Sequence, residues 1–162
     1  MSEELEQLRQ YLETGQLEAA FGLLDEMDEM SRDDKIHKIQ SYMHVLLVHL
    51  IKQAAERRTT PSWDRTIRHA LFWIPRINRR RKAGGSYIPA DDLQEALDDV
   101  YEHAMDNAAA EALGGEHTAA SLGTLVDRER LLAQAYEMIV ATQNERPSNA
   151  LGMDALVRDT LL

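Results

Sequence analysis

Apolar side chains recur every three or four residues along almost the whole chain, and no other feature of the sequence restricts the fold as much. This spacing places them on one face of an α-helix, whereas a half-buried strand needs an apolar residue at every second position. No segment keeps that alternation, and the hairpin turns Asn-Gly and Asp-Gly are absent. The sequence therefore predicts an all-α protein.

Glycine, proline and capping residues divide this pattern into six expected helices, over about 3–14, 17–30, 32–57, 61–82, 89–113 and 124–144. We expect a break between the second and third because Ser31 opens a Ser-Arg-Asp-Asp pattern that resembles a capping box. Pro75 either kinks the fourth helix or ends it near Ile74.

The connections between these helices are short, which favours antiparallel neighbours. We therefore expect an up-and-down helical bundle of four to five main helices with a short C-terminal extension. Residues 1–144 are expected to form a single domain. The tail over 145–162 is expected to form one short helix, over 153–160, or none.

The composition narrows the class of protein. The 162 residues suffice for a buried core, and 44% hydrophobic with 28% charged residues is ordinary for a globular chain. The chain has no cysteine, which excludes disulfides and thiolate chemistry and fits a reducing compartment. Its acidic start is unlike a signal peptide, and no apolar run reaches the roughly 20 residues of a membrane span. We expect a cytoplasmic protein without a membrane partner.

Charge is strongly segregated along the chain. Nine of the 18 basic residues lie within 57–82, beside the single acid Asp64, so this segment carries +8 and the remainder −18. One interpretation is a surface that docks on an acidic protein partner or on a second copy of the chain, giving a homodimer. The alternative is nucleic-acid or anion binding, with Trp63, Phe72 and Trp73 stacking on bases. The predicted basic interaction surface comprises Arg76, Arg79, Arg80, Arg81 and Lys82.

Polar residues of the helices over 32–57 and 61–82 form a second candidate site. Consecutive antiparallel helices bring such residues together, and the candidate binding residues are His49, Lys52, Trp63, Arg65 and Arg68. A further alternative is therefore an enzyme that acts on a small anion near His49, Lys52 and Arg68, although the sequence identifies no catalytic residue.

The sequence contains no recognisable pattern for metal-dependent or nucleophilic chemistry. A di-iron bundle needs a Glu-x-x-His pair on each of two helices, and only Asp34-x-x-His37 approximates one. Asp99 and His103 share a helical face but form a single pair. No Gly-x-Ser-x-Gly elbow or glycine-rich phosphate loop occurs. We expect no metal ion and no cofactor, and we favour a non-enzymatic role.

Several short stretches resemble a known family. They are His49-Leu50-Ile51-Lys52, Ser62-Trp63 and Thr66-Ile67-Arg68, preceded by the acidic stretch 24–31 and followed by Ala96-Leu97, Tyr101-Glu102 and Ala104. Over about 5–113 the chain resembles domain of unknown function family 29, which is abundant in cyanobacteria and other bacteria. It differs from the arginine-rich stretch of that family at 72–75, which reads Phe-Trp-Ile-Pro. The resemblance implies a helical bundle without an assigned activity, so the leading hypothesis is a helical protein-interaction module.

Overall fold

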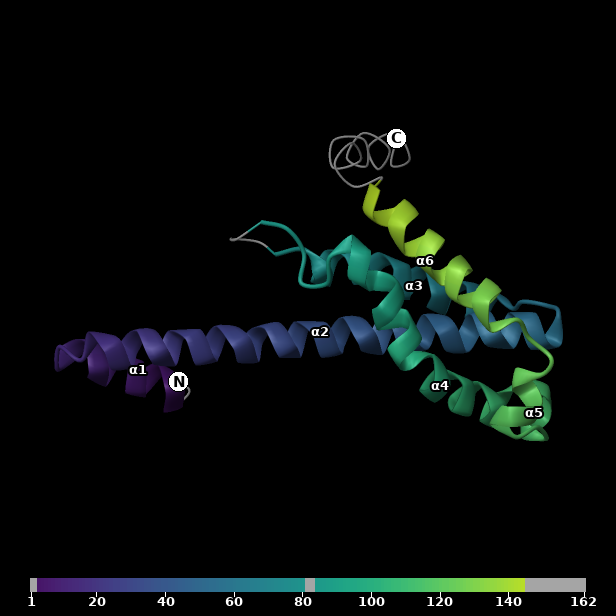
Figure 1. Cartoon of the computed structure of the whole chain (residues 1–162). Coiled ribbons are helices and arrows are strands. Elements are labelled where there is room, and N and C mark those ends of the chain that lie inside the picture. Colours follow the sequence, from purple (N-terminus) through teal and green to yellow (C-terminus); the bar gives the residue numbers. More distant parts are fainter. Residues whose placement is uncertain (1–2, 81–83, 145–162) are drawn as a thin grey trace, which may run out of the picture. The chain divides into compact units, whose positions relative to one another are not determined.

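Figure 1 shows the computed structural model, which describes residues 3–80 and 84–144. Within these residues the regular secondary structure is helical, which confirms the predicted all-α helical bundle. The chain divides into two compact units, Met1–His37 and Lys38–Leu162, and each is described by itself. The expected single domain over 1–144 stays a prediction, and the tail over 145–162 lies outside the described residues.

The first unit contains α1, Glu3–Glu13, and residues 17–37 of α2, whose full extent is Leu17–Glu56. α1 ends in a Schellman motif, in which the amide of Gln16 donates to the Tyr11 carbonyl at 2.8 Å and the amide of Gly15 to the Leu12 carbonyl at 3.3 Å. Gly15 has a φ of 74°, a left-handed conformation that glycine adopts without strain. The predicted helix end at Gly15 is therefore confirmed.

The break expected at Ser31 does not occur, because α2 continues without interruption from Leu17 to Glu56. In a helix interior, serine and aspartate each lower helix stability by less than about 1 kcal/mol relative to alanine. No glycine or proline lies within 23–60 to interrupt the backbone. A capping pattern starts a helix only where the preceding backbone has left the helical conformation. The two helices expected over 17–30 and 32–57 are therefore one.

In the second unit, residues 38–56 of α2 pack beside α3, Pro61–Asn78. The rings of Tyr42 and His69 lie 6.0 Å apart, and the Lys52 ammonium lies 4.8 Å from the centre of the Trp63 ring. Residues later in α2 thus contact residues earlier in α3. The two helices are antiparallel, as their short connection predicts.

The second unit continues with the 3-10 turn η1, Ala90–Asp92, and α4, Leu93–Glu111. The 3-10 turn η2, Ala112–Gly115, leads to the short α5, Ala119–Gly123, and to α6, Arg128–Asn144. α6 packs against both α3 and α4. No described helix is both long enough and apolar enough to span a membrane.

The apolar faces of these helices form the core of the second unit. Fully or almost fully buried side chains include Ile39, Met43, Leu46 and Leu50 of α2, Ile67 and Ile74 of α3, Leu97 and Ala104 of α4, and Ala135 and Ile139 of α6. Burial of this face fixes which side of α3 remains in contact with solvent.

Candidate interaction surface

The start of α3 follows from its sequence. Thr60 is the N-cap, and its hydroxyl oxygen accepts a hydrogen bond from the amide of Trp63 at 3.1 Å. Pro61 occupies the first helical position, where its missing amide hydrogen costs nothing. α3 runs through Pro75 to Asn78, so the helix does not end near Ile74.

One side of α3 presents arginine and aromatic side chains, which we call the α3 face: Arg65, Arg68, Phe72, Trp73 and Arg76. Four of the five recur at intervals of three and four residues, so they lie along one stripe of the helix. Arg65 and Arg68 are exposed, and Phe72 and Trp73 remain 43% and 38% exposed. The buried side of α3 carries Ile67, Ala70 and Ile74.

The arginines of the α3 face form no ion pair with a carboxylate among the described residues. The single acid of α3, Asp64, accepts hydrogen bonds from Thr59 at 2.7 Å and from Gln53 at 3.4 Å. Arg76 donates to the carbonyl of Phe72 at 2.8 Å, and its guanidinium lies 3.4 Å from the centre of the Phe72 ring. The α3 face therefore combines uncompensated positive charge with exposed aromatic rings.

Asn78 fixes the start of the loop that continues the basic segment. Its side-chain amide, 1% exposed, donates to the Ile88 carbonyl at 2.9 Å and accepts from the Ile88 amide at 2.7 Å. Arg79 is exposed, and the Arg80 guanidinium lies 5.7 Å from the Tyr87 ring. Of the predicted basic interaction surface, Arg76, Arg79 and Arg80 thus lie on α3 or just after it, whereas Arg81 and Lys82 lie outside the described residues.

Two residues of the second candidate site meet. Lys52, 8% exposed, places its ammonium 2.9 Å from a carboxylate oxygen of Glu111 and 4.8 Å from the centre of the Trp63 ring. The Arg58 guanidinium lies 4.9 Å from the same ring. Lys52 therefore already has an anionic and an aromatic partner, and Trp63 contacts two cations.

The other predicted members of that site point elsewhere. The Nδ1 atom of His49 lies 2.8 Å from the Val45 carbonyl oxygen, which only accepts, so Nδ1 carries the hydrogen of this bond. Arg65 and Arg68 belong to the α3 face, and Arg68 lies roughly 140° around α3 from Trp63. A binding or catalytic role for these residues stays a prediction.

A histidine pair between α2 and α4 was not singled out from the sequence. The rings of His44 and His103 lie 4.8 Å apart, and the side-chain nitrogen of Asn107 lies 2.7 Å from Nε2 of His44. Nδ1 of His44 is buried and has no hydrogen-bond partner among the described residues. Burial, with a smaller effect of the His103 charge, lowers the pKa of His44 from its ordinary value of 6.5. Only the packing of the two helices, which no sequence pattern reveals, brings these rings together.

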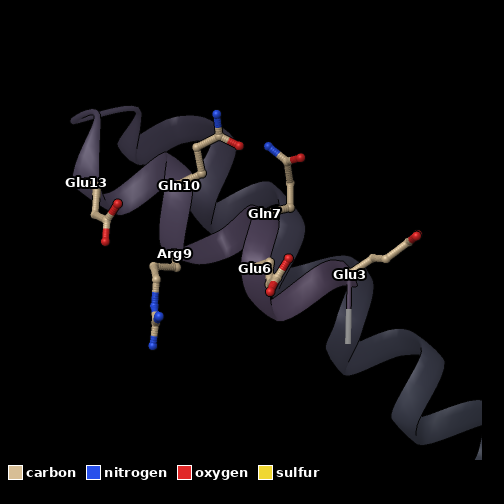
Figure 2. A pocket seen from close by; sticks show the side chains of 6 residues that line it. All are labelled: Glu3, Glu6, Gln7, Arg9, Gln10 and Glu13. Atoms are coloured by element: carbon tan, nitrogen blue, oxygen red, sulfur yellow. The ribbon is translucent and has the colours of Figure 1, made fainter. Parts of the chain in front are cut away.

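The described residues of each unit line a hollow at the surface. Figure 2 shows one along α1, lined by Glu3, Glu6, Gln7, Arg9, Gln10 and Glu13, whose side chains spread along a single helix. A second groove runs between residues 50–57, at the end of α2 and just after it, and residues 125–134, and exposed Leu125 is one of the residues that line it. In the part of the chain that the structure describes, no three histidine, aspartate or glutamate side chains gather in a way that could hold a metal ion.

The fold and this surface define a helical-bundle protein that presents a basic, aromatic face on one helix. The chain belongs to the family described as Domain of unknown function DUF29, whose model matches residues 1–136. The match confirms the resemblance seen over 5–113 and extends it through α5 into α6, with the α3 face inside it. No curated protein and no solved structure matches the chain.

Proposed function

We propose that the protein is a non-enzymatic helical protein-interaction module that docks the α3 face on an acidic protein surface, and that it acts as a homo-oligomer in the cytoplasm. The observation that supports this proposal is that exposed Arg65 and Arg68 have no carboxylate partner among the described residues and share the α3 face with the exposed rings of Phe72 and Trp73. Arginine, tryptophan and other aromatic side chains are enriched at the centres of protein interfaces and contribute much of their binding energy.

The charge of the whole chain favours a protein partner over a polyanion. A net charge of −10 repels nucleic acid at long range, whereas an acidic helix of limited length meets only the basic segment. Electrostatic complementarity then sets which partner binds and how fast, and the aromatic rings supply apolar area that leaves water on docking.

Binding of single-stranded nucleic acid is the second candidate, and the exposure of the same side chains favours it. Arg65 and Arg68 would contact phosphates, while Phe72 and Trp73 would stack on bases. This candidate differs from protein docking in its salt dependence, because each neutralised phosphate releases counterions and steepens the loss of affinity with salt.

Fluorescence anisotropy with two labelled probes separates the candidates. One probe is an amphipathic helical peptide of glutamate and leucine, and the other is a single-stranded thymidine oligonucleotide of the same net charge. We expect the wild type to bind the peptide, and Arg65→Glu with Arg68→Glu to weaken binding at least about tenfold, or 1.4 kcal/mol. Arg130→Glu, a single charge reversal at an exposed position of α6, is the control and is expected to bind as the wild type.

Each result decides between the candidates. The wild type could bind the oligonucleotide and not the peptide, with an affinity that falls steeply with salt and is lost in the Arg65 and Arg68 variant. That result would replace protein docking with nucleic-acid binding. Equal peptide affinity in the wild type and in both variants removes the α3 face from the proposal.

A further inference from the structure

The first unit has large apolar side chains that are partly exposed. Leu17, Phe21 and Leu24, which we call the hairpin face, are between 43% and 62% exposed. Leu17, Phe21 and Leu24 are four and three residues apart, so they lie above one another on successive turns of α2. A monomer rarely leaves such a stripe in water, and an exposed apolar stripe marks an interaction surface.

The hairpin face lies in a strongly acidic unit. Residues 1–37 contain eleven acidic and three basic side chains, a net charge of −8. Glu18 and Asp25 stand three and four residues from Phe21, and Asp28 stands four residues from Leu24, so carboxylates border the apolar stripe. This surface therefore suits a partner that offers apolar or aromatic side chains bordered by cations.

The α3 face of the same chain has that chemistry. Phe72 and Trp73 lie between Arg68 and Arg76 along α3, and neither Arg65 nor Arg68 has an ion-pair partner among the described residues. The two surfaces are complementary in both respects: aromatic rings meet an apolar stripe, and arginines meet the carboxylates that border it.

Like surfaces do not pair. Two hairpin faces would bring together two units of charge −8, and two α3 faces would oppose rows of arginines, so both arrangements are repulsive. Building on the proposed function, we propose that the partner of the α3 face is the hairpin face of a second copy of this chain. When each copy contributes both surfaces, two identical contacts close a two-fold dimer.

Two charge-reversed variants of the full chain test this pairing. The first carries Arg65→Glu and Arg68→Glu, and the second carries Glu18→Lys and Asp25→Lys. Light scattering is expected to give a dimer for the wild type and a monomer for each variant alone, with the dissociation constant raised at least about tenfold. An equimolar mixture of the two variants is expected to restore the dimer, because each hairpin face then meets an α3 face of opposite charge.

The controls separate loss of docking from loss of folding. Glu95→Lys with Asp99→Lys reverses two exposed carboxylates of α4 and is expected to leave the dimer intact. Phe21→Ser removes apolar area without changing charge and is expected to weaken the dimer. Circular dichroism of every variant shows whether its helices remain.

The outcomes distinguish this inference from the proposed function. A wild type that stays monomeric at every concentration, yet binds the acidic peptide through Arg65 and Arg68, overturns self-docking and leaves the proposed function standing. Dimers that persist in both variants, or a mixture that does not associate, overturn the pairing of the two faces. A wild type that neither dimerises nor binds the peptide overturns both.

Discussion

Replacing Asn78 by alanine is expected to destabilise the protein by about 2–4 kcal/mol. The Asn78 side chain makes two hydrogen bonds, of 2.9 and 2.7 Å, to the carbonyl and amide of Ile88, and both residues are buried. Asn78→Ala leaves both backbone groups of Ile88 without a partner, and each buried unsatisfied group costs about 1–3 kcal/mol. We expect the total loss to be smaller than the sum of the two upper values, because water that enters the space left by the side chain partly satisfies these two groups.

Urea unfolding followed by circular dichroism measures this loss as a shift in the midpoint at unchanged slope. Gln94→Ala, at an exposed position of α4, is the control and is expected to change stability by less than about 0.5 kcal/mol. A loss for Asn78→Ala below about 1 kcal/mol would refute the reasoning, because two buried backbone groups would then have been satisfied without the side chain.

Three further predictions concern titration, backbone strain and packing. The pKa of His44 is lower in the folded state than in the unfolded chain, so the unfolded chain takes up the proton at a higher pH as the solution is acidified. The free energy of unfolding therefore falls as the pH drops below 6.5. His44→Gln is expected to remove this part of the pH dependence. Gly115 has a φ of 73°, and Gly115→Ala places a Cβ 2.8 Å from the Ala110 carbonyl oxygen, so this variant is expected to lose about 2–3 kcal/mol in thermal unfolding. Gly114→Ala places its Cβ in open space and is expected to lose about 1 kcal/mol. Lys52→Ala loses aliphatic packing and costs about 1–2 kcal/mol, whereas Lys52→Met costs less than about 0.5 kcal/mol.

Each of these three has a result that contradicts it. The titration argument fails when His44→Gln and the wild type lose stability in parallel between about pH 7.5 and 5. Equal costs at Gly114 and Gly115 would show that the contact with Ala110 relaxes freely. A large loss in Lys52→Met would show that the ion pair with Glu111, whose side chain is 58% exposed, contributes more than exposed pairs usually do.

Local signals predicted the helix ends where the backbone itself is restricted. Gly15 adopts the left-handed conformation that ends α1, and Thr60 with Pro61 forms the start of α3. Ser31 misled the prediction because a capping side chain lowers the cost of a helix start without forcing one. Pro75 likewise restricts only its own turn, so α3 extends to Asn78, whose side chain is satisfied by the distant backbone of Ile88.

The candidate surface was predictable only in part. The charge pattern identified the basic segment, and helical spacing places its arginines on one side of α3. Which side faces solvent depends on burial of Ile67 and Ile74 against neighbouring helices. The meeting of Lys52 with Glu111 joins residues far apart in sequence, and local patterns carry no information on such contacts.

The exposed ring of Trp73 offers the most direct measurement of the α3 face. In a Trp63→Phe variant, Trp73 is the single tryptophan, and quenching of its fluorescence by acrylamide reports its contact with solvent. Saturating acidic peptide, or a protein concentration high enough for self-association, is expected to reduce this quenching and shift the emission to shorter wavelength, because docking covers the ring. Quenching that stays unchanged under both conditions would contradict the claim that the α3 face is a docking surface.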